Sequence, residues 1–393
     1  MMKRVLVLGG GFAGLETAIY LKKEKNLEVT LVSERDYFYI YPTSIWIPTG
    51  QTTKEKVSVS LDELGKKHGF YVHVETVTQV DGANKKVTLA SGHVLENYDY
   101  IVLALGQDKI NSITGTKEHT LSICGKPEEA VELKKRLDTL VQKGSGRIAM
   151  GFGGNPKDTS AVRGGPAFEV LFNFHNFLKK KGLRDKFELI FFAPMDKPGQ
   201  KMGEKALVMM DKMFKMTNIS KKVGSKITSF DAKGVNFEDG ESIESDLTMF
   251  ISAGKGHSVL EASDLPLSDA GFVVTNEFNE IEGFESIYAV GDSASLMGPE
   301  WRAKQGHVAE VMAKNVAKNI ASHIKGKKAT ESYIGHLNIL CVMDTGDGAA
   351  FVYRDNKGGK MIPMPFVGHW MKRGWGWYCR NSKLGKIPRI PGM

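Results

Sequence analysis

The sequence has too few cysteines for a disulfide-stapled fold. Cys124, Cys341 and Cys379 are its only cysteines in 393 residues, and they lie far apart. Disulfide-rich domains need several closely spaced cysteines, and structural zinc sites need clustered cysteine or histidine ligands. The sequence therefore predicts neither a disulfide scaffold nor a metal site.

Long apolar runs are also missing. No stretch reaches the ~18 uninterrupted apolar residues of a membrane-spanning helix. The chain opens on Met-Met-Lys-Arg and a short apolar run, but three glycines at positions 9–11 end this run before a cleavage site can follow. We therefore expect no cleavable signal peptide, and a cytoplasmic protein unless the chain attaches to a membrane surface.

Acidic residues are absent from position 356 to the end of the chain. These residues include eight Lys or Arg, so they account for the whole formal net charge of +8. Trp370, Trp375 and Trp377 lie among them. Mixed basic and aromatic residues are typical of segments that lie in a membrane interface. We expect the tail Pro363–Met393 to bind a membrane surface; a subunit contact in a homodimer is the alternative, and we expect no nucleic-acid binding.

A glycine pattern near the start of the chain is typical of dinucleotide-binding folds. Gly9, Gly11 and Gly14 fit G-x-G-x-x-G between an apolar strand and a helix, and Glu34 ends the next strand. The glycines permit a tight turn, the approach of a pyrophosphate, and close packing of helix on strand. The helix N-terminus adds unpaired N–H groups, and Glu34 can accept hydrogen bonds from a ribose. The sequence predicts that a dinucleotide binds here.

Two further strand ends favour FAD as that dinucleotide. One strand delivers Gly291 and Asp292, and such a strand–Gly–Asp element holds ribityl and phosphate oxygens in flavoproteins with two dinucleotide domains. Ala104 and Gly106 resemble the A-T-G element of the same proteins, with Leu105 in the place of threonine. We therefore expect FAD as the cofactor.

The segment Lys304–Gln305–Gly306 opens a further helix. A helix N-terminus aimed at the pyrimidine edge of a flavin stabilises negative charge on the reduced ring. Capping of the helix is the simpler interpretation of the same residues.

Hydrophobic periodicity predicts an α/β fold with two Rossmann-like dinucleotide-binding domains, one inserted in the other, and a C-terminal amphipathic tail. The expected strands are Arg4–Leu8, Leu27–Ser33, Tyr98–Leu105, Arg147–Met150, Phe187–Phe192, Leu247–Ala253 and Ile287–Val290, and the expected helices are Ala13–Lys23, Ala167–Lys181 and His307–His323. We place the FAD-binding domain at residues 1–110 and 256–335, and the inserted domain at 111–255. Residues 336–393 form a flavin-facing and membrane or interface segment.

The sequence resembles the sulfide:quinone oxidoreductase and flavocytochrome c sulfide dehydrogenase group of FAD-dependent pyridine nucleotide-disulfide oxidoreductases. The resemblance covers nearly the whole chain. Besides the fingerprint, it is carried by Tyr41–Gly50 (YPTSIWIPTG), Leu121–Gly125 (LSICG), Gly165–Glu169 (GPAFE), Val290–Asp292 (VGD), Lys304–Gly306 (KQG) and Cys341–Gly346 (CVMDTG). It implies that Cys341 lies next to the flavin as a redox cysteine, assisted by Cys124, and that Lys304 belongs to the same catalytic site.

The sequence departs from this group at one cysteine. The group usually keeps a second redox cysteine just before its G-P-A-[YF]-E segment, but residues 159–166 read TSAVRGGP. A histidine that often follows the first cysteine is missing after Cys124, and Gln200 stands where another is usual. A mechanism that stores sulfur across two cysteines would lack half of its apparatus.

The second domain has a degenerate fingerprint. Gly151 and Gly153 are followed by Pro156 in place of the third glycine, and about ten more residues precede the helix. The following strand ends in Ala-Pro, with no acid to hold a ribose. We predict that this domain does not use NAD(P)H, and that Arg163 with the two glycines after it is an alternative anion site.

The resemblance implies an FAD-dependent oxidoreductase that passes electrons from sulfide, or a related small sulfur donor, through FAD to quinone. Two alternatives stay open: an NADH:quinone oxidoreductase of type II, and a non-catalytic flavoprotein subunit that docks a cytochrome partner. Because the flavin motifs all precede the tail, we expect removal of Pro363–Met393 to release the protein from membranes and to leave FAD bound.

Overall fold

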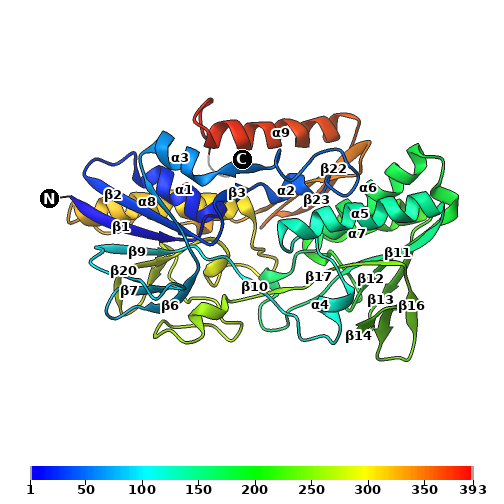
Figure 1. Cartoon of the computed structure of the whole chain (residues 1–393), viewed down its shortest axis with the longest axis horizontal. Helices are drawn as coiled ribbons and strands as arrows, with labels where there is room; N and C mark the ends of the chain where they lie inside the picture. Colours follow the sequence, from blue (N-terminus) through cyan, green and yellow to red (C-terminus); the bar gives the residue numbers. More distant parts are fainter. Residues whose placement is uncertain (1, 391–393) are drawn as a thin grey trace.

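The structure is a computed structural model that describes residues 2–390. Two α/β domains lie side by side along the long axis of the molecule, and the C-terminal helix lies along the top of the view in Figure 1. Within residues 2–390, no helix combines the length and apolar character needed to cross a bilayer.

The first domain contains a six-stranded sheet with the order β19-β20-β9-β1-β2-β5. Its strands are β1 (Lys3–Leu8), β2 (Leu27–Ser33), β5 (Tyr71–Val74), β9 (Tyr100–Leu103), β19 (Glu280–Ile281) and β20 (Phe284–Ala289). Neighbouring strands pair in parallel except β19 with β20. Helices α1 (Phe12–Leu21) and α8 (Gly306–Ile324) pack against each other beside this sheet. Their first residues therefore lie at the carboxyl ends of the parallel strands, where α/β sheets bind ligands.

The second domain contains a four-stranded parallel sheet with the order β13-β12-β11-β17. Its strands are β11 (Gly146–Phe152), β12 (Phe187–Ala193), β13 (Ser220–Val223) and β17 (Leu247–Ile251), and its helices are α5 (Pro127–Lys143), α6 (Gly165–Lys180) and α7 (Glu204–Met216). Phenylalanines fill the space between sheet and helices: the rings of Phe168 and Phe191 lie 4.9 Å apart, and Phe214 lies 5.3 Å from Phe191.

The chain crosses between the two domains twice. It leaves the first domain through β10 (Asp108–Lys109) and returns through β18 (Gly254–Lys255), and these two strands pair with each other. Shorter elements complete both domains: β3 (Tyr37–Tyr39), β4 (Ser58–Ser60), β6 (Val77–Asp81), β7 (Lys86–Leu89), β8 (Val94–Leu95), β14 (Ile227–Asp231), β15 (Gly234–Phe237), β16 (Ser242–Glu244), α2 (Tyr41–Ser44), α3 (Leu61–His68) and α4 (Thr116–His119). The predicted α/β fold with two Rossmann-like domains is confirmed. The strand and helix ends differ from the prediction by a few residues, as expected where helices fray.

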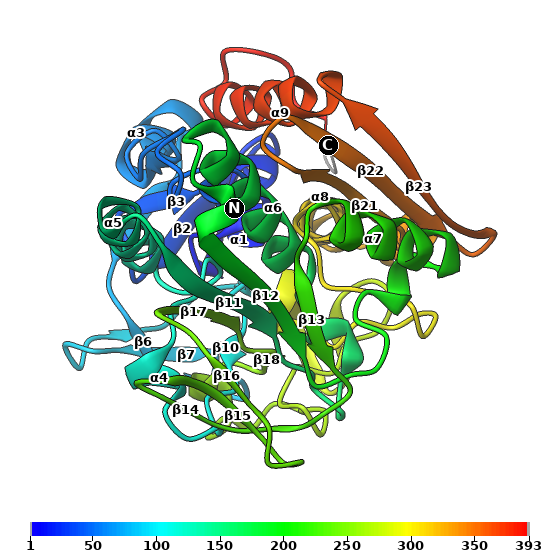
Figure 2. The same ribbon diagram turned by 90° about the vertical axis from the view of Figure 1, so that its right-hand side faces the viewer.

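The C-terminal layer is an antiparallel sheet followed by a helix. Strands β21 (Ile339–Asp344), β22 (Gly348–Asp355) and β23 (Gly358–Pro365) pair in sequence order, and α9 (Val367–Lys383) follows. Figure 2 shows this layer beside α6 and α7 of the second domain. The layer therefore bridges the two domains.

The basic residues of the tail do not form the outward-facing charge that the sequence suggested. Five of the eight point into the body of the protein and bind its carboxylates, carbonyls or polar side chains: Lys372, Arg373, Arg380, Lys383 and Arg389. Leu384 is buried as well and does not continue the exposed stripe of Trp370 and Trp377. The outer face of α9 is therefore apolar rather than basic.

Candidate flavin and redox site

The G-x-G-x-x-G segment has the geometry that a pyrophosphate needs. Gly9 has a φ of +112°, and a Cβ here would overlap the backbone of Ala104. A Cβ on Gly14 would overlap the carbonyl oxygen of Gly9, so this glycine permits close packing of α1 on β1. A Cβ on Gly11 would meet nothing within 4 Å. The first two contacts are internal, and the open space at Gly11 is where a ligand can approach the backbone.

Glu34 lies just past the end of β2, on the same side of the sheet. Its side chain is 65% exposed, and its nearest charged partner is Arg35 at 3.7 Å. This weak pair leaves its oxygens accessible to ribose hydroxyls. The prediction for Glu34 fits this position.

The predicted ribityl-binding turn lies next to the A-L-G segment. Gly291 has a φ of +62°, and its neighbours across the turn are Ala13 of α1 and Ala309 of α8. Gly106 N–H donates to the Ser293 hydroxyl at 2.9 Å, and a Cβ on Gly106 would meet open space. The fold thus brings Ala104, Gly106, Gly291 and Asp292 to one edge of the first sheet, and these residues fit FAD.

Asp292 has a partner that the sequence did not suggest. Arg163, from the long loop of the second domain, forms an ion pair with its carboxylate, and both side chains are mostly buried. This loop is the stretch where the related group keeps its second redox cysteine. At this end of the site the chain therefore presents a guanidinium instead of a thiol.

Lys304 contacts the backbone of the same turn. Its ammonium donates to the backbone oxygens of Asp292, at 3.1 Å, and of Ala294, and it lies 3.8 Å from the ring centre of Phe272. Burial lowers the pKa of Lys304 to about 7. These contacts describe a residue that positions the turn, and the catalytic role predicted for it stays a prediction.

The start of α8 touches the strand that carries Cys341. The Gln305 side-chain oxygen accepts a hydrogen bond from Leu340 N–H at 3.3 Å. Cys341 is the next residue of β21 after Leu340. It is half-buried, and burial raises the pKa of its thiol to about 12. The K-Q-G and C-V-M-D-T-G segments are thus held together, and an unassisted Cys341 is a neutral thiol at pH 7.

Cys124 lies in the loop before α5, near two cations. Burial raises the pKa of its thiol, and the charges of Lys109 and Arg163 act in the opposite direction. Lys109 is itself poorly solvated, and burial lowers its pKa to about 8. Tyr41 joins its own segment to this loop, since its hydroxyl donates to the Gly125 carbonyl at 3.2 Å. Cys124 is therefore a thiol in a cationic setting.

A buried ion pair next to Cys341 was missed at the sequence level. Lys372 of α9 donates to Glu169 of α6 and to the Val342 carbonyl, the latter at 3.1 Å. Glu169 also accepts from Asp344 N–H at 3.1 Å. Burial raises the pKa of Glu169 in spite of Lys372. A buried carboxyl with a raised pKa can hold a proton, so this pair adds proton-handling groups to the cysteine strand.

Asp344 anchors α9 to the same strand. It is fully buried and accepts hydrogen bonds from Trp46 Nε1 at 3.0 Å and from His369 Nδ1 at 2.6 Å. These bonds hold its pKa below the ordinary value although burial opposes this. Arg373 Nε donates to His369 Nε2 at 2.8 Å, which places the imidazole proton on Nδ1 because an arginine nitrogen can only donate.

Three glycines of the second fingerprint and its loop are closely surrounded by protein atoms. A Cβ on Gly151 would overlap the Phe192 backbone and ring, and one on Gly164 would lie 2.6 Å from the ring of Phe152. A Cβ on Gly153 would lie 3.0 Å from the ring of Phe250. At Gly153, the counterpart of Gly11, the ring of Phe250 therefore takes up the space that is open in the first fingerprint, while a Cβ on Gly165 at the start of α6 would meet nothing within 4 Å.

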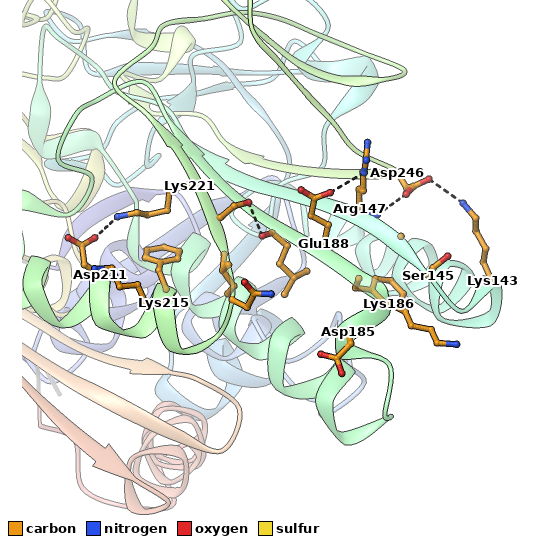
Figure 3. Close-up of a pocket in the computed structure, with 17 residues that line it drawn as sticks. Lys143, Ser145, Arg147, Asp185, Lys186, Glu188, Asp211, Lys215, Lys221 and Asp246 are labelled. Atoms are coloured by element: carbon orange, nitrogen blue, oxygen red, sulfur yellow. Dashed lines mark hydrogen bonds and ion pairs between the residues drawn. The ribbon is translucent and has the colours of Figure 1, made fainter.

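A surface hollow lies elsewhere on the second domain. It is at the amino ends of β11, β12 and β13, the opposite edge from the one that binds ligands in parallel sheets (Figure 3). Its charges pair with one another, as in Arg147 with Glu188 at 3.0 Å and Lys143 with Asp246 at 3.4 Å. We assign no site to it.

Two Rossmann-like domains, one open fingerprint and a strand–Gly–Asp turn define a flavin-dependent oxidoreductase. The sequence profile of the pyridine nucleotide-disulphide oxidoreductase family matches residues 3–314, and the chain belongs to this family of FAD-binding flavoproteins.

The most informative relatives are two kinds of enzyme. The chain is 28% identical over 376 residues to the sulfide-quinone reductase of Aquifex aeolicus, covering 90% of this chain and 84% of the relative. It is 25% identical over 390 residues to the type II NADH:quinone oxidoreductase of Staphylococcus saprophyticus, covering 93% and 94%.

Solved structures agree with the fold. The crystal structure of the Aquifex aeolicus sulfide:quinone oxidoreductase superposes with a TM-score of 0.86 at 26% identity, covering 98% of this chain and 93% of that one. The NDH2 structure from Plasmodium falciparum superposes with a TM-score of 0.77 at 14% identity, which shows the shared fold alone.

Proposed function

We propose that this flavoprotein oxidises sulfide, or a related small sulfur compound, and reduces quinone. The observation that carries the proposal is the placement of Cys341. Its strand is held against the start of α8 by Gln305 and lies beside the Glu169–Lys372 pair. A thiol, a proton-holding carboxyl and a flavin-binding helix end therefore converge on one site.

The residues of the chain supply donor binding and proton transfer beside the flavin site. FAD, when bound, supplies two-electron transfer between a donor and an acceptor that need not meet. Cys341 binds the donor sulfur. Lys109 adds positive charge near Cys124 that attracts an anionic donor such as hydrosulfide, since Arg163 is already paired with Asp292. Glu169 and Lys372 hold the protons that a quinone takes up on reduction. With one cysteine in place of two, the donor sulfur would be held as the outer sulfur of a Cys341 persulfide, its two electrons passing to FAD. This outer sulfur then transfers to a small thiol or a second hydrosulfide, which restores the Cys341 thiol.

NADH is the less favoured donor because Pro156 replaces the third glycine of the second fingerprint and the ring of Phe250 lies close to Gly153. Anaerobic titration of the purified protein tests this choice: we expect sulfide to bleach the flavin absorbance near stoichiometric amounts, and NADH at micromolar concentrations to leave it unchanged. Rapid bleaching by NADH would show that the similarity to type II NADH:quinone oxidoreductases extends to the donor. Bleaching by neither, together with a co-purifying haem protein, would favour the cytochrome-docking subunit.

Cys341→Ser provides the residue-level form of the same test. We expect the flavin of this variant to be reduced by sulfide at least ~100-fold more slowly, since covalent catalysis by the thiol is lost. Cys379→Ser is the matched control, because Cys379 is buried in α9 and does not belong to the strand that carries Cys341; we expect it to leave the rate unchanged. Equal rates in both variants would remove Cys341 from the mechanism.

Membrane docking through the outer face of α9 follows from the quinone assignment. Quinones reside in the bilayer, and the exposed side chains of this face are large and apolar: Phe366 at 76%, Val367 at 64%, Trp370 at 70% and Trp377 at 62% exposure. Aromatic and aliphatic side chains on one helix face are typical of in-plane membrane contact. We propose that this stripe, and not the basic residues, makes the contact.

Vesicle binding should therefore be largely independent of charge. We expect the protein to bind neutral phosphatidylcholine vesicles, and to stay bound at about 1 M salt, where the Debye length is about 3 Å. Trp370→Glu with Trp377→Glu should weaken binding by roughly two to four orders of magnitude, because burial of each ring contributes about 1.5–3 kcal/mol. The charge-matched control replaces two exposed lysines, Lys357→Gln with Lys360→Gln, and lowers the net charge by the same two units. If this control abolishes vesicle binding and the Trp variant does not, the contact is electrostatic. If neither variant changes vesicle binding, the stripe belongs to a subunit contact, and sedimentation should show a homodimer.

A further inference from the structure

The two helices that frame the FAD site carry a pair of buried acids. α1 begins directly after Gly11, α8 begins directly after Gln305, and the Gly291 turn lies between their first residues. About one turn further along, Glu16 of α1 is 1% exposed and Glu310 of α8 is 4% exposed. Two carboxylates buried between helices require positive partners, because an uncompensated charge is costly inside a protein.

The tail supplies these positive partners. The ammonium of Lys383 lies 2.7 Å from a Glu16 oxygen and also contacts Glu310. Arg389 forms a second ion pair with Glu16. All four side chains are nearly inaccessible, and two negative charges meet two positive ones.

The same cations reach the fingerprint itself. Lys383 lies 5.9 Å from the ring centres of Phe12 and Phe38, which pack edge to face on each other at 4.9 Å. Phe12 follows Gly11, and its ring lies 3.7 Å from where a Cβ on Gly306 would stand. The Lys383 carbonyl is fixed by His68 Nε2 at 2.6 Å. A residue 372 positions beyond Gly11 in the sequence thus packs under the cofactor-binding turn.

We propose that Lys383, supported by Arg389, is a positioning residue for FAD: it clamps α1 to α8 and thereby sets the two helix N-termini and the Gly291–Asp292 turn between them. The proposal rests on the FAD binding of the family and is independent of the electron donor and acceptor. It reverses the expectation that the tail can be removed without loss of flavin. Removing Pro363–Met393 leaves Glu16 and Glu310 buried without the two cations that the tail provides.

The test compares Lys383→Met with Lys386→Met, which changes an exposed lysine three residues away. Apo-protein of each variant is titrated with FAD, and the FAD-to-protein ratio and the thermal midpoint of the apo form are measured. We expect Lys383→Met to bind FAD at least about tenfold more weakly, and Lys386→Met to match the parent protein. Lys383→Arg, which keeps the charge, should restore most of the affinity.

A purely structural role predicts a different pattern. It would lower the thermal midpoint of the Lys383→Met apo-protein and leave the FAD dissociation constant unchanged, and this result would overturn the proposal. Should Lys383→Met fail to fold, Arg389→Met serves instead, because Lys383 still neutralises Glu16 there; it should weaken FAD binding to a smaller extent. Unchanged FAD affinity in Arg389→Met would then count against the clamp.

Discussion

Gly11→Val should yield a folded but colourless protein. The backbone of Gly11 has φ −83° and ψ −165°, an extended conformation that valine adopts readily. A Cβ here meets no protein atom within 4 Å, so the side chain projects into the space where the pyrophosphate has to approach. We expect no flavin absorbance after gel filtration, and a thermal midpoint equal to that of the parent apo-protein.

Gly14→Val is the control that separates loss of cofactor from loss of fold. Its Cβ would overlap the Gly9 carbonyl oxygen, so this variant should lose FAD and also unfold at a lower temperature. Overpacking of this kind costs about 1–3 kcal/mol or more. Stoichiometric FAD in Gly11→Val would overturn the assignment of the first fingerprint as the cofactor site.

The parts of the site that sequence reasoning found are those encoded within one short segment. Gly9, Gly11 and Gly14 need only a strand and a helix to acquire their geometry, and the strand–Gly–Asp turn needs only its own strand. Pro156 and the missing acid of the second fingerprint can be read from one segment in the same way, and the conclusion that this domain does not use NAD(P)H stays a prediction. Such local patterns can be recognised in the sequence because they do not depend on how the rest of the chain packs.

The parts that were missed depend on how α9 packs on the body. Lys372 and Lys383 were counted as surface charge because a sequence does not tell which helix face is covered. Their spacing contained a signal, since Lys372, Gly376, Cys379 and Lys383 recur at helical intervals opposite Trp370 and Trp377. Gly376, which weakens an isolated helix, is explained by the same packing: a Cβ there would lie 2.6 Å from Thr43. Buried acids on the body, Glu16 and Glu169, complete this face.

Lys372→Met should both destabilise the protein and slow quinone reduction. The substitution leaves Glu169 buried without its cation, and breaking a buried pair in this way costs about 3–5 kcal/mol. The pKa of Glu169 is already raised above its ordinary value of 4.5, and loss of Lys372 raises it further. A group whose pKa is raised in the folded state stabilises the folded protein while it is protonated, at pH values below its ordinary pKa. This stabilisation is lost as the pH rises through the raised pKa. The stability defect should therefore be large at pH 7 to 8 and shrink toward pH 4.5, as measured by urea unfolding.

The double variant Lys372→Met/Glu169→Leu separates the structural effect from the chemical one. Replacing both partners by apolar side chains removes the unpaired charge, so most of the lost stability should return. The rate at which sulfide reduces its flavin is measured separately, because Glu169 and Lys372 lie beside Cys341 and their loss also changes the surroundings of this thiol. Turnover with quinone should stay low, since the groups that hold the acceptor protons are gone. If turnover recovers together with stability, the pair only fastens α9 to α6, and the protons reach the quinone by another route.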